Sequence, residues 1–418
     1  MSTILPELDG PCALCSPILT QDDNAPMPLS RRSAFASAGA FSTALATGVN
    51  ANSVHAGSEH MQNVPSGEFI IEAGWVLTEI NGRHELLNNA SVLVSDERIA
   101  KVSKERIRGD YTRINASKQL LVPGFISGHT HACTATPTRG VIEGGRRPNN
   151  RRPQELVEQL TDSDLDKLTA YNVAELLRGG ATTHLEMSLS LRQAKSYVRV
   201  AEAWGIRGYP GGMVPGSNIL GPIWACTNDK VLFDAEDAIL QEVTDNLAFA
   251  KTKMGASDGR IIPMMTPHAT DTHTERTMAA IAGAARELGT GLHIHLSQSE
   301  IETERVKRLW GMTPTQWLDS FGLLDGIVFG AHMGGLDWDV DPQILAERGV
   351  VLAHCPSAGG AGGSSQNYPE ALAAGLKVNI GIDTHSNDYL ENLKLAVLYG
   401  QARYTLQQRT SEQDVSYP

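Results

Sequence analysis

Several features that define other protein classes are missing from this sequence. No apolar run reaches roughly 18 residues, so we expect no ordinary transmembrane helix and no membrane partner. There is no long block of lysine and arginine, and 35 basic against 47 acidic residues leave a formal charge of −12. That balance argues against a nucleic-acid partner. Five cysteines, of which only Cys12 and Cys15 lie close together, are not the pattern of a disulfide framework. What remains is ordinary globular composition over 418 residues, enough for one large α/β barrel or several smaller domains.

The first 60 residues differ from the rest of the chain. Arg31 and Arg32 precede a weakly apolar stretch of Ala, Gly, Ser and Thr at 36–49, and small-residue sites follow it. This order resembles a twin-arginine export signal. Residues 1–60 are therefore predicted to be a targeting segment, which would place the protein in the periplasm. The alternative is a disordered tail on a cytoplasmic protein.

Residues 61–120 are predicted to form a small β-sheet unit. Short runs rich in β-branched and aromatic residues are separated by turn residues such as Asn81-Gly82. The predicted strands are 69–71, 75–77, 90–94 and 99–102.

Residues 121–418 show a different pattern, in which short apolar segments alternate with helical ones. Eight strand-then-helix units whose strands are buried on both faces indicate a (β/α)8 barrel of the TIM type. The predicted strands are 122–131, 181–187, 206–213, 261–268, 291–296, 327–332, 350–354 and 378–383. The predicted helices include 165–177, 235–254, 274–288, 342–347 and a last one at 391–407.

Histidines and one carboxylate stand where barrel strands should end. His129 and His131 are two residues apart on the first strand, so both side chains point into the barrel. His295 closes the fifth strand, His332 the sixth and Asp383 the eighth. The carboxyl ends of barrel strands form the catalytic mouth, so these side chains are expected to meet there. Such nitrogen and oxygen donors predict one divalent metal ion, Zn²⁺ in first place and Fe²⁺ as the alternative.

The segments that carry these residues resemble the motifs of the amidohydrolase superfamily. The similarity is greatest to the branch that includes s-triazine chlorohydrolases and deaminases of cytosine, guanine and adenosine compounds, and it covers about residues 68–400. The opening motif is Leu-Val-Pro-Gly-Phe-Ile-Ser-Gly-His-Thr-His. The matching segments, in the family's order, are 121–131, 295–296, 331–332, 353–357 and 381–383.

The resemblance implies a mononuclear metal with four ligands: His129, His131, His295 and Asp383. It also implies that His332 positions or deprotonates the metal-activated water and that His268 faces the substrate. A metal lowers the pKa of its water toward about 7, and His332 and Asp383 can pass a proton to the leaving group. The predicted activity is hydrolysis of a non-peptide C–N bond in a small, cyclic nitrogen compound.

Two features depart from the family pattern. Deaminases of this branch carry His-Leu-x-Glu on strand five, whereas this chain has His295-Leu296-Ser297-Gln298. An amide neither donates an acidic proton nor accepts one at neutral pH, so Gln298 is predicted to orient the substrate by hydrogen bonds. In addition, no strands return after 391–407 to complete the small β-sheet unit, which is therefore expected to be incomplete.

Alternatives to C–N hydrolysis remain. One is hydrolytic removal of another leaving group, such as halide, from an activated heterocycle. Another is a catalytically weak metal- or ligand-binding barrel. The enzyme interpretations imply a small-molecule substrate, and a homo-oligomer is compatible with either. Among the neighbouring residues, His184 and His293 are predicted to be packed and hydrogen-bonded, while Glu186 and His354 stay open between structural and functional roles.

Overall fold

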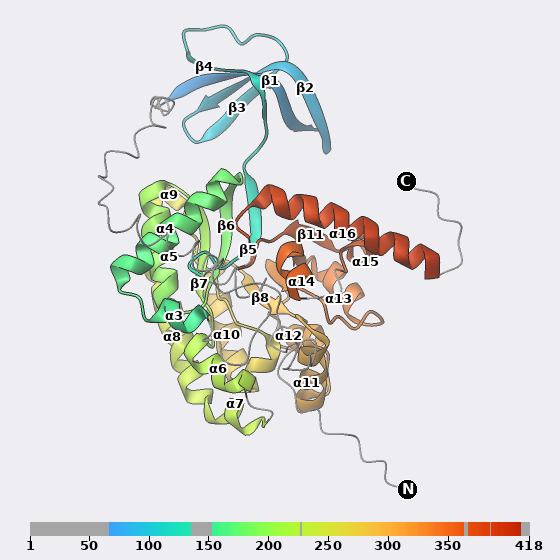
Figure 1. The fold of residues 1–418 in the computed structure, drawn as a ribbon. Helices are drawn as coiled ribbons and strands as arrows, with labels where there is room; N and C mark the ends of the chain where they lie inside the picture. Colours follow the sequence, from blue (N-terminus) through green and yellow to red (C-terminus); the bar gives the residue numbers. More distant parts are fainter. Residues whose placement is uncertain (1–66, 135–152, 226–227, 363–366, 385, 411–418) are drawn as a thin grey trace, which may run out of the picture. The chain divides into compact units, whose positions relative to one another are not determined.

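The computed structural model describes residues 67–134, 153–225, 228–362, 367–384 and 386–410 (Figure 1). These residues fall into two compact units that divide after Pro123. The predicted targeting segment, 1–60, lies outside the described residues. In the part of the chain that the structure describes, no helix combines the length and apolarity needed to cross a membrane.

The smaller unit is a four-stranded sheet. Its strand order is β3-β2-β1-β4, with antiparallel hairpins and a parallel β1–β4 pair. Asn81 and Gly82 both have positive φ, as a tight two-residue hairpin turn requires. The strands are β1 (Glu68–Ile80), β2 (Arg83–Ser95), β3 (Arg98–Ser103) and β4 (Thr112–Leu121).

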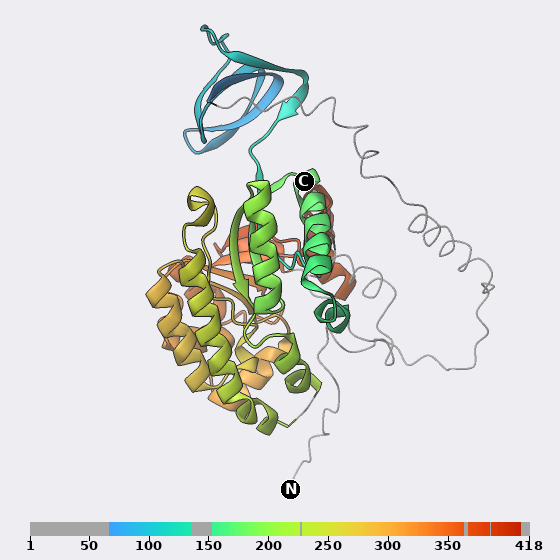
Figure 2. The ribbon, with the colours of Figure 1, turned by 90° about the vertical axis from the view of Figure 1, so that its left-hand side faces the viewer.

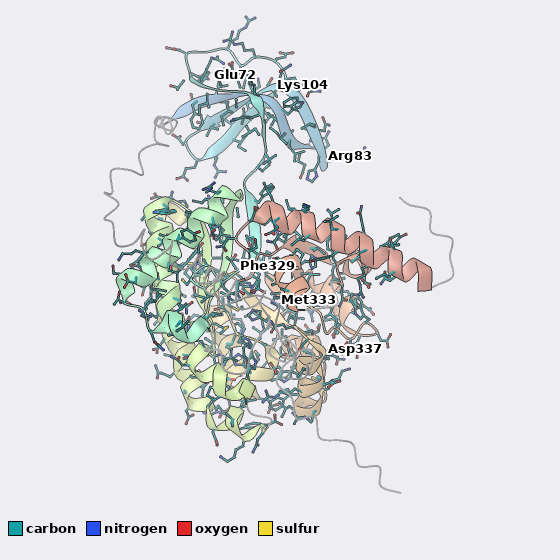
Figure 3. All side chains as sticks on the ribbon, viewed as in Figure 1. Glu72, Arg83, Lys104, Phe329, Met333 and Asp337 are labelled. Carbon is teal, nitrogen blue, oxygen red and sulfur yellow. The ribbon has the colours of Figure 1, made fainter. Side chains whose placement is uncertain are left out.

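The sequence prediction for this unit was wrong in two respects. The predicted runs 69–71 and 75–77 belong to one strand, β1, whose pairing with β4 shifts register around Gly74. The predictions also missed β4, because its sequence is polar and lacks a clear alternation. A bond of 2.7 Å from Arg113 Nη1 to Glu72 Oε1 ties β4 to β1, and Figure 3 labels Glu72 on this sheet.

The larger unit contains parallel strands in two ladders. One has the order β5-β6-β7 and the other β11-β10-β9-β8. An isolated bridge between Thr130 and Asp383 joins the first ladder to the chain just after β11. The strands are β5 (Phe125–Thr130), β6 (Ala181–Ser188), β7 (Arg207–Gly212), β8 (Leu292–Leu296), β9 (Val328–His332), β10 (Val351–His354) and β11 (Lys377–Ile380).

The fourth predicted strand, 261–268, does not form a regular ladder. Isolated bridges place this extended segment between β7 and β8, with Ile261 and Pro267 facing β7 and Met265 facing β8. Pro263 and Pro267 have no backbone N–H to give to a ladder, which explains the interruption. The bridges still place all eight segments in the cyclic order of a (β/α)8 barrel.

Helices follow most of these strands and cover their outer surface. In Figure 2 the long helices α4 (Asp162–Arg178), α5 (Leu191–Trp204), α8 (Glu236–Lys253) and α10 (Glu275–Leu288) lie alongside one another over the strands. Helix α4 contacts α5, and α8 contacts α10. Most helices begin and end close to the predicted positions; α10, for example, starts after a capping box at Thr274 and ends before Gly289 in the left-handed region. The helices are α3 (Pro153–Glu158), α4 (Asp162–Arg178), α5 (Leu191–Trp204), α6 (Ser217–Ala225), α7 (Lys230–Asp234), α8 (Glu236–Lys253), α9 (Ala256–Gly259), the 3-10 turn η2 (Thr270–Thr272), α10 (Glu275–Leu288), α11 (Glu300–Trp310), α12 (Pro314–Ser320), α13 (Asp341–Arg348), α14 (Pro356–Gly362), α15 (Tyr368–Ala373) and α16 (Tyr389–Thr410).

The main hydrophobic core lies between the strands and these helices. Ile294 on β8, Met278 on α10 and Trp317 on α12 are all essentially inaccessible to solvent and belong to one cluster. Burying an aliphatic or aromatic side chain of this size contributes roughly 1.5–3 kcal/mol. This packing holds the strand ends, and with them the polar side chains described next, in fixed positions.

Candidate active site

Backbone hydrogen bonds hold the first histidine pair against the eighth segment of the barrel. Asp383 N donates to His129 O at 3.0 Å, and His131 N donates to Asp383 O at 3.3 Å. A side chain at Gly381 would place its Cβ 2.7 Å from Cys355 Sγ and 2.9 Å from His129 Cβ. Glycine is therefore required there for the chain to pass this close to His129.

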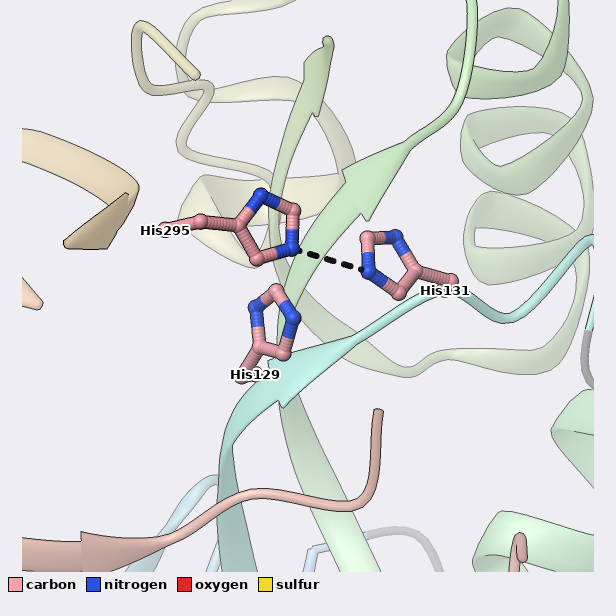
Figure 4. A group of neighbouring side chains, drawn as sticks. All are labelled: His129, His131 and His295. Carbon is pink, nitrogen blue, oxygen red and sulfur yellow. Dashed lines mark hydrogen bonds between the residues drawn. The ribbon is translucent and has the colours of Figure 1, made fainter. Parts of the chain in front are cut away.

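Three imidazoles converge at this end of the barrel (Figure 4). His131 Nδ1 bonds to Met187 O, and His295 Nδ1 bonds to His268 O at 2.7 Å. A carbonyl oxygen can only accept, so both Nδ1 atoms carry hydrogen and both Nε2 atoms present lone pairs. These two Nε2 atoms lie 3.3 Å apart. Two facing lone pairs repel each other, and a cation between them would remove that cost.

His129 completes the group. Its Nδ1 lies 2.8 Å from Nε2 of His293, while its own Nε2 is buried and has no hydrogen-bond partner among the described residues. His293 was predicted to be packed and hydrogen-bonded, and it is, with His129 as its partner. A buried nitrogen without a partner is costly in a protein interior. The arrangement is that of a metal ligand whose other ring nitrogen is fixed by a neighbour.

His332 and Asp383 stand next to the three imidazoles. Asp383 Oδ1 is 3.5 Å from His131 Nε2, and its Oδ2 is 3.6 Å from His332 Nε2. His332 is the last residue of β9, the strand on which Figure 3 labels Phe329. His332, Met333 and Asp383 all have positive φ, which is unfavourable for residues with a Cβ. Strain of this kind is concentrated at functional sites, where the fold enforces a geometry.

The donor set fits a divalent metal ion. Two groups of candidate ligand atoms each lie within 4.8 Å of one another: His129, His131 and His295, and His129, His332 and Asp383. Burial lowers the pKa of all four imidazoles, and the neighbouring histidines lower that of His129 further. The rings are therefore neutral near pH 7, the state in which an imidazole binds metal.

The two predicted substrate-facing residues are placed differently. His268 is buried beside the cluster, with its ring centroid 5.0 Å from that of His295 and 4.6 Å from that of Trp224 on α6. Gln298 lies three residues beyond His295 and is half-buried. Its backbone N donates to Glu302 Oε2 at 2.6 Å, and no hydrogen bond joins its carboxamide to another described residue.

Two buried carboxylates near the site have structural contacts that sequence patterns did not reveal. Glu186 accepts from Ala132 N at 2.9 Å and from Ser188 Oγ at 2.7 Å, so it supports the backbone directly after His131. Glu302 contacts Thr270 as well as Gln298. None of the predicted helices covered residue 302, and only its position four residues after Gln298 offered a signal.

His184 has the structural role that was predicted for it. It is buried on β6, with Nδ1 3.1 Å from the Tyr197 hydroxyl and Nε2 3.0 Å from Ala181 O. Burial lowers its pKa from 6.5 to about 4. Between those two values the unfolded chain binds a proton that the folded chain does not, so the stability contributed by neutral His184 is complete above about pH 6.5 and is lost as the pH falls toward 4.

His184→Gln is therefore expected to reduce the pH dependence of stability. Urea unfolding at pH 7.5 and 5.5 should show that the loss of unfolding free energy on acidification is about 1 kcal/mol smaller in the variant than in the wild type. His84→Gln, on the exposed part of β2, is the control and should leave the loss unchanged. An equal loss in His184→Gln and wild type would contradict the lowered pKa of His184 in the folded protein.

Comparison with known proteins identifies the family. The Amidohydrolase family model matches residues 120–412. A 5-methylthioadenosine/S-adenosylhomocysteine deaminase of Archaeoglobus fulgidus is 32% identical over 306 residues, covering 72% of this chain and 68% of the relative. A 5'-deoxyadenosine deaminase of Methanosarcina mazei is 26% identical, covering 79% and 73%. The chain belongs to the amidohydrolase family, as its motifs predicted.

Solved structures support the fold. A guanine deaminase from C. acetobutylicum superposes with a TM-score of 0.68 at 18% identity, covering 84% of this chain and 82% of that one. A zinc-bound adenosine deaminase from Xanthomonas campestris superposes with a TM-score of 0.62 at 22% identity, covering 82% and 76%. They confirm the predicted barrel. The family match and the deaminase relatives agree, at the level of the family, with the predicted class of hydrolases acting on non-peptide C–N bonds. The matched regions span between 60% and 73% of the curated relatives.

Proposed function

We propose that this protein uses one divalent metal ion, Zn²⁺ before Fe²⁺, to hydrolyse the bond between an amino group and the ring of an aminopurine compound, with release of ammonia. The observation that carries the proposal is the convergence of the imidazoles of His129, His131 and His295 beside the His332–Asp383 pair. The deaminase relatives support the leaving group. The proposed metal ligands are His129, His131, His295 and Asp383.

The metal and the side chains have separate tasks in this proposal. A bound divalent ion supplies Lewis acidity, which lowers the pKa of water toward about 7. His332 is neutral near pH 7 because burial lowers its pKa, so its Nε2 is free to take a proton from the attacking water. Asp383, 3.6 Å away, can share that proton and return it to the departing nitrogen.

The Gln298 carboxamide can form hydrogen bonds in both directions with the edge of an aminopurine ring. The carboxamide donates and accepts at once, and such an edge presents a ring nitrogen that accepts beside an amino group that donates. His268 would line the same space, fixed by Thr272 Oγ1 at 3.5 Å from its Nδ1 and by Trp224. Binding would thus be directional, although Gln298 delivers no proton to the ring.

A second candidate follows from the same residue. Removal of halide from an activated heterocycle needs no protonation of an amine leaving group, and Gln298 in place of the glutamate of deaminases favours such chemistry. The deaminase relatives favour the first candidate.

A product assay separates the two. Purified, Zn²⁺-loaded protein should release ammonia from at least one of adenosine, 5-methylthioadenosine, S-adenosylhomocysteine and 5'-deoxyadenosine, and no chloride from a chloro-s-triazine. Chloride release without ammonia release would overturn the first candidate in favour of the second. Release of neither product by protein that holds stoichiometric metal would favour the weak binding barrel.

Gln298→Glu is expected to increase deamination. A carboxyl group at this position can carry a proton to the ring nitrogen, and general acid catalysis contributes about 10²–10⁴-fold, of which at least about tenfold should appear in kcat/KM for ammonia release. Gln298→Met, similar in size but without hydrogen-bonding groups, is the matched control and should lower kcat/KM. If Gln298→Glu and Gln298→Met both match the wild type, residue 298 does not contact the substrate.

Export stays a prediction that rests on Arg31 and Arg32, which lie outside the described residues. A homo-oligomer likewise stays a prediction. A small-molecule substrate agrees with the names of the relatives.

A further inference from the structure

One buried carboxylate outside the metal cluster connects the two segments that carry the substrate-facing residues. Glu302 lies in the first turn of α11 and is 4% exposed. Its Oε1 accepts from the backbone N of Thr270 at 3.2 Å and from the Thr270 hydroxyl. Its Oε2 accepts from the backbone N of Gln298 at 2.6 Å. Both carboxylate oxygens of Glu302 thus accept hydrogen bonds, each from a different loop.

Both contacts of Glu302 fall just after a barrel segment that carries a residue of the candidate site. Thr270 comes two residues after His268, in the short turn η2 that follows the fourth segment of the barrel. Gln298 comes three residues after His295 and two residues beyond the end of β8. Directly below, His295 N and Nδ1 both bond to His268 O, at 3.1 and 2.7 Å. Two contacts therefore join these segments. One is the contact of His268 with His295, a proposed metal ligand, and the other is made by Glu302.

The same helix face makes a second contact with η2. Arg305, one turn after Glu302, lies 3.7 Å from Asp271 and 3.1 Å from Asp229. Residues three apart on a helix lie on the same face, so α11 holds η2 through both side chains. Burial raises the pKa of Glu302, because a carboxylate taken out of water loses its hydration at a cost in free energy. A polar group retained in the interior at such a cost needs its hydrogen bonds.

We propose that Glu302 is a positioning residue for the reaction: it sets the distance between His268 and Gln298, and hence the fit of the heterocyclic substrate, without contacting that substrate. The inference rests on the proposed function for the choice of substrate. It predicts that loss of Glu302 weakens substrate binding more than it slows the chemical step, because His332 and Asp383 belong to other strands.

Glu302→Gln tests this with a nearly isosteric change. The amide NH₂ of the glutamine would face one of the backbone N–H donors, so the variant loses the hydrogen bond of Glu302 either to Thr270 or to Gln298. Because a buried hydrogen-bonding group left without its partner is costly, we expect KM for the aminopurine substrate to rise at least about tenfold, with kcat changed less than about threefold. Glu304→Gln, exposed on the same helix, is the matched control and should behave as the wild type. Bound Zn²⁺ per chain should stay at the wild-type value.

A second readout does not depend on turnover. In protein labelled with 5-fluorotryptophan, the ¹⁹F resonance of Trp224, assigned with Trp224→Phe, reports on the adjacent His268 ring. It should shift in Glu302→Gln and not in Glu304→Gln, with Trp75 in the smaller unit as an internal reference. An unshifted Trp224 resonance overturns the proposal. If the wild type turns over no aminopurine, the proposed function fails. The Trp224 resonance alone then tests whether Glu302 positions His268.

A milder pair of variants covers the case in which Glu302→Gln does not fold. Thr270→Val removes only the hydrogen bond from the Thr270 hydroxyl to Glu302, whereas Thr270→Ser keeps it. The valine variant should raise KM and shift the Trp224 resonance, and the serine variant should restore both. Equal behaviour of the two, or a fall in kcat together with loss of metal, would show a merely structural role and overturn the proposal.

Discussion

His129→Ala is expected to remove most of the bound metal and to lower kcat/KM by more than about 100-fold. Even the outer partners of metal ligands cost about 10–100-fold when they are lost, and His129 is placed to bind directly. Its buried Nε2 has no partner among the described residues, and His293 already occupies Nδ1. Truncation would leave three of the four proposed ligands, with a poorly held water in place of the imidazole.

Metal per chain, measured by mass spectrometry after dialysis, checks this expectation. His84→Ala is the matched control, because it makes the same change on the exposed part of β2 and should leave both metal and activity unaltered. Stoichiometric metal in His129→Ala would show that His129 is not a ligand. Loss of metal in both variants would point to a general effect of the preparation.

His332→Asn should give the opposite combination, in which the metal is retained and turnover is lost. We expect kcat to fall about 10²–10⁴-fold, since general base catalysis contributes that much. Asparagine is well matched to the position: φ at His332 is +74°, a region that asparagine tolerates better than most residues. The variant should therefore remove the imidazole without distorting the end of β9.

Thermal unfolding and metal content are the controls for His332→Asn, and both should match the wild type. A variant with full metal and at least half of the wild-type kcat would show that His332 does not handle the proton. Asp383 would then be left as the proton acceptor, at 3.5 Å from His131.

The positions of the side chains in the candidate site were largely predictable from the sequence. Histidines at the ends of apolar segments mark the mouth of a barrel, since each strand's end is visible as a change in hydrophobicity. This reasoning placed His129, His131, His295 and His332 together, and the structure brings them together with Asp383. The eight-segment order followed from the same alternation.

What the sequence did not predict depends on contacts between distant segments. The pairing of His293 with His129 spans 164 residues. The polar strand β4 is held by its parallel pairing with β1, which no local pattern reports. Positive φ at Asp383 is imposed by the bonds of its backbone to His129 and His131. The irregular fourth segment is an exception, because Pro263 and Pro267 were visible and should have argued against a regular strand.

A titration of metal-free protein with Zn²⁺ tests the central claim most directly. Ammonia release from the best aminopurine substrate should be absent without metal, rise in proportion to added Zn²⁺ and level off at one ion per chain. Full activity in protein that contains no metal, or one tightly bound ion per chain with no ammonia release from any aminopurine, would contradict the proposed metal-dependent C–N hydrolase.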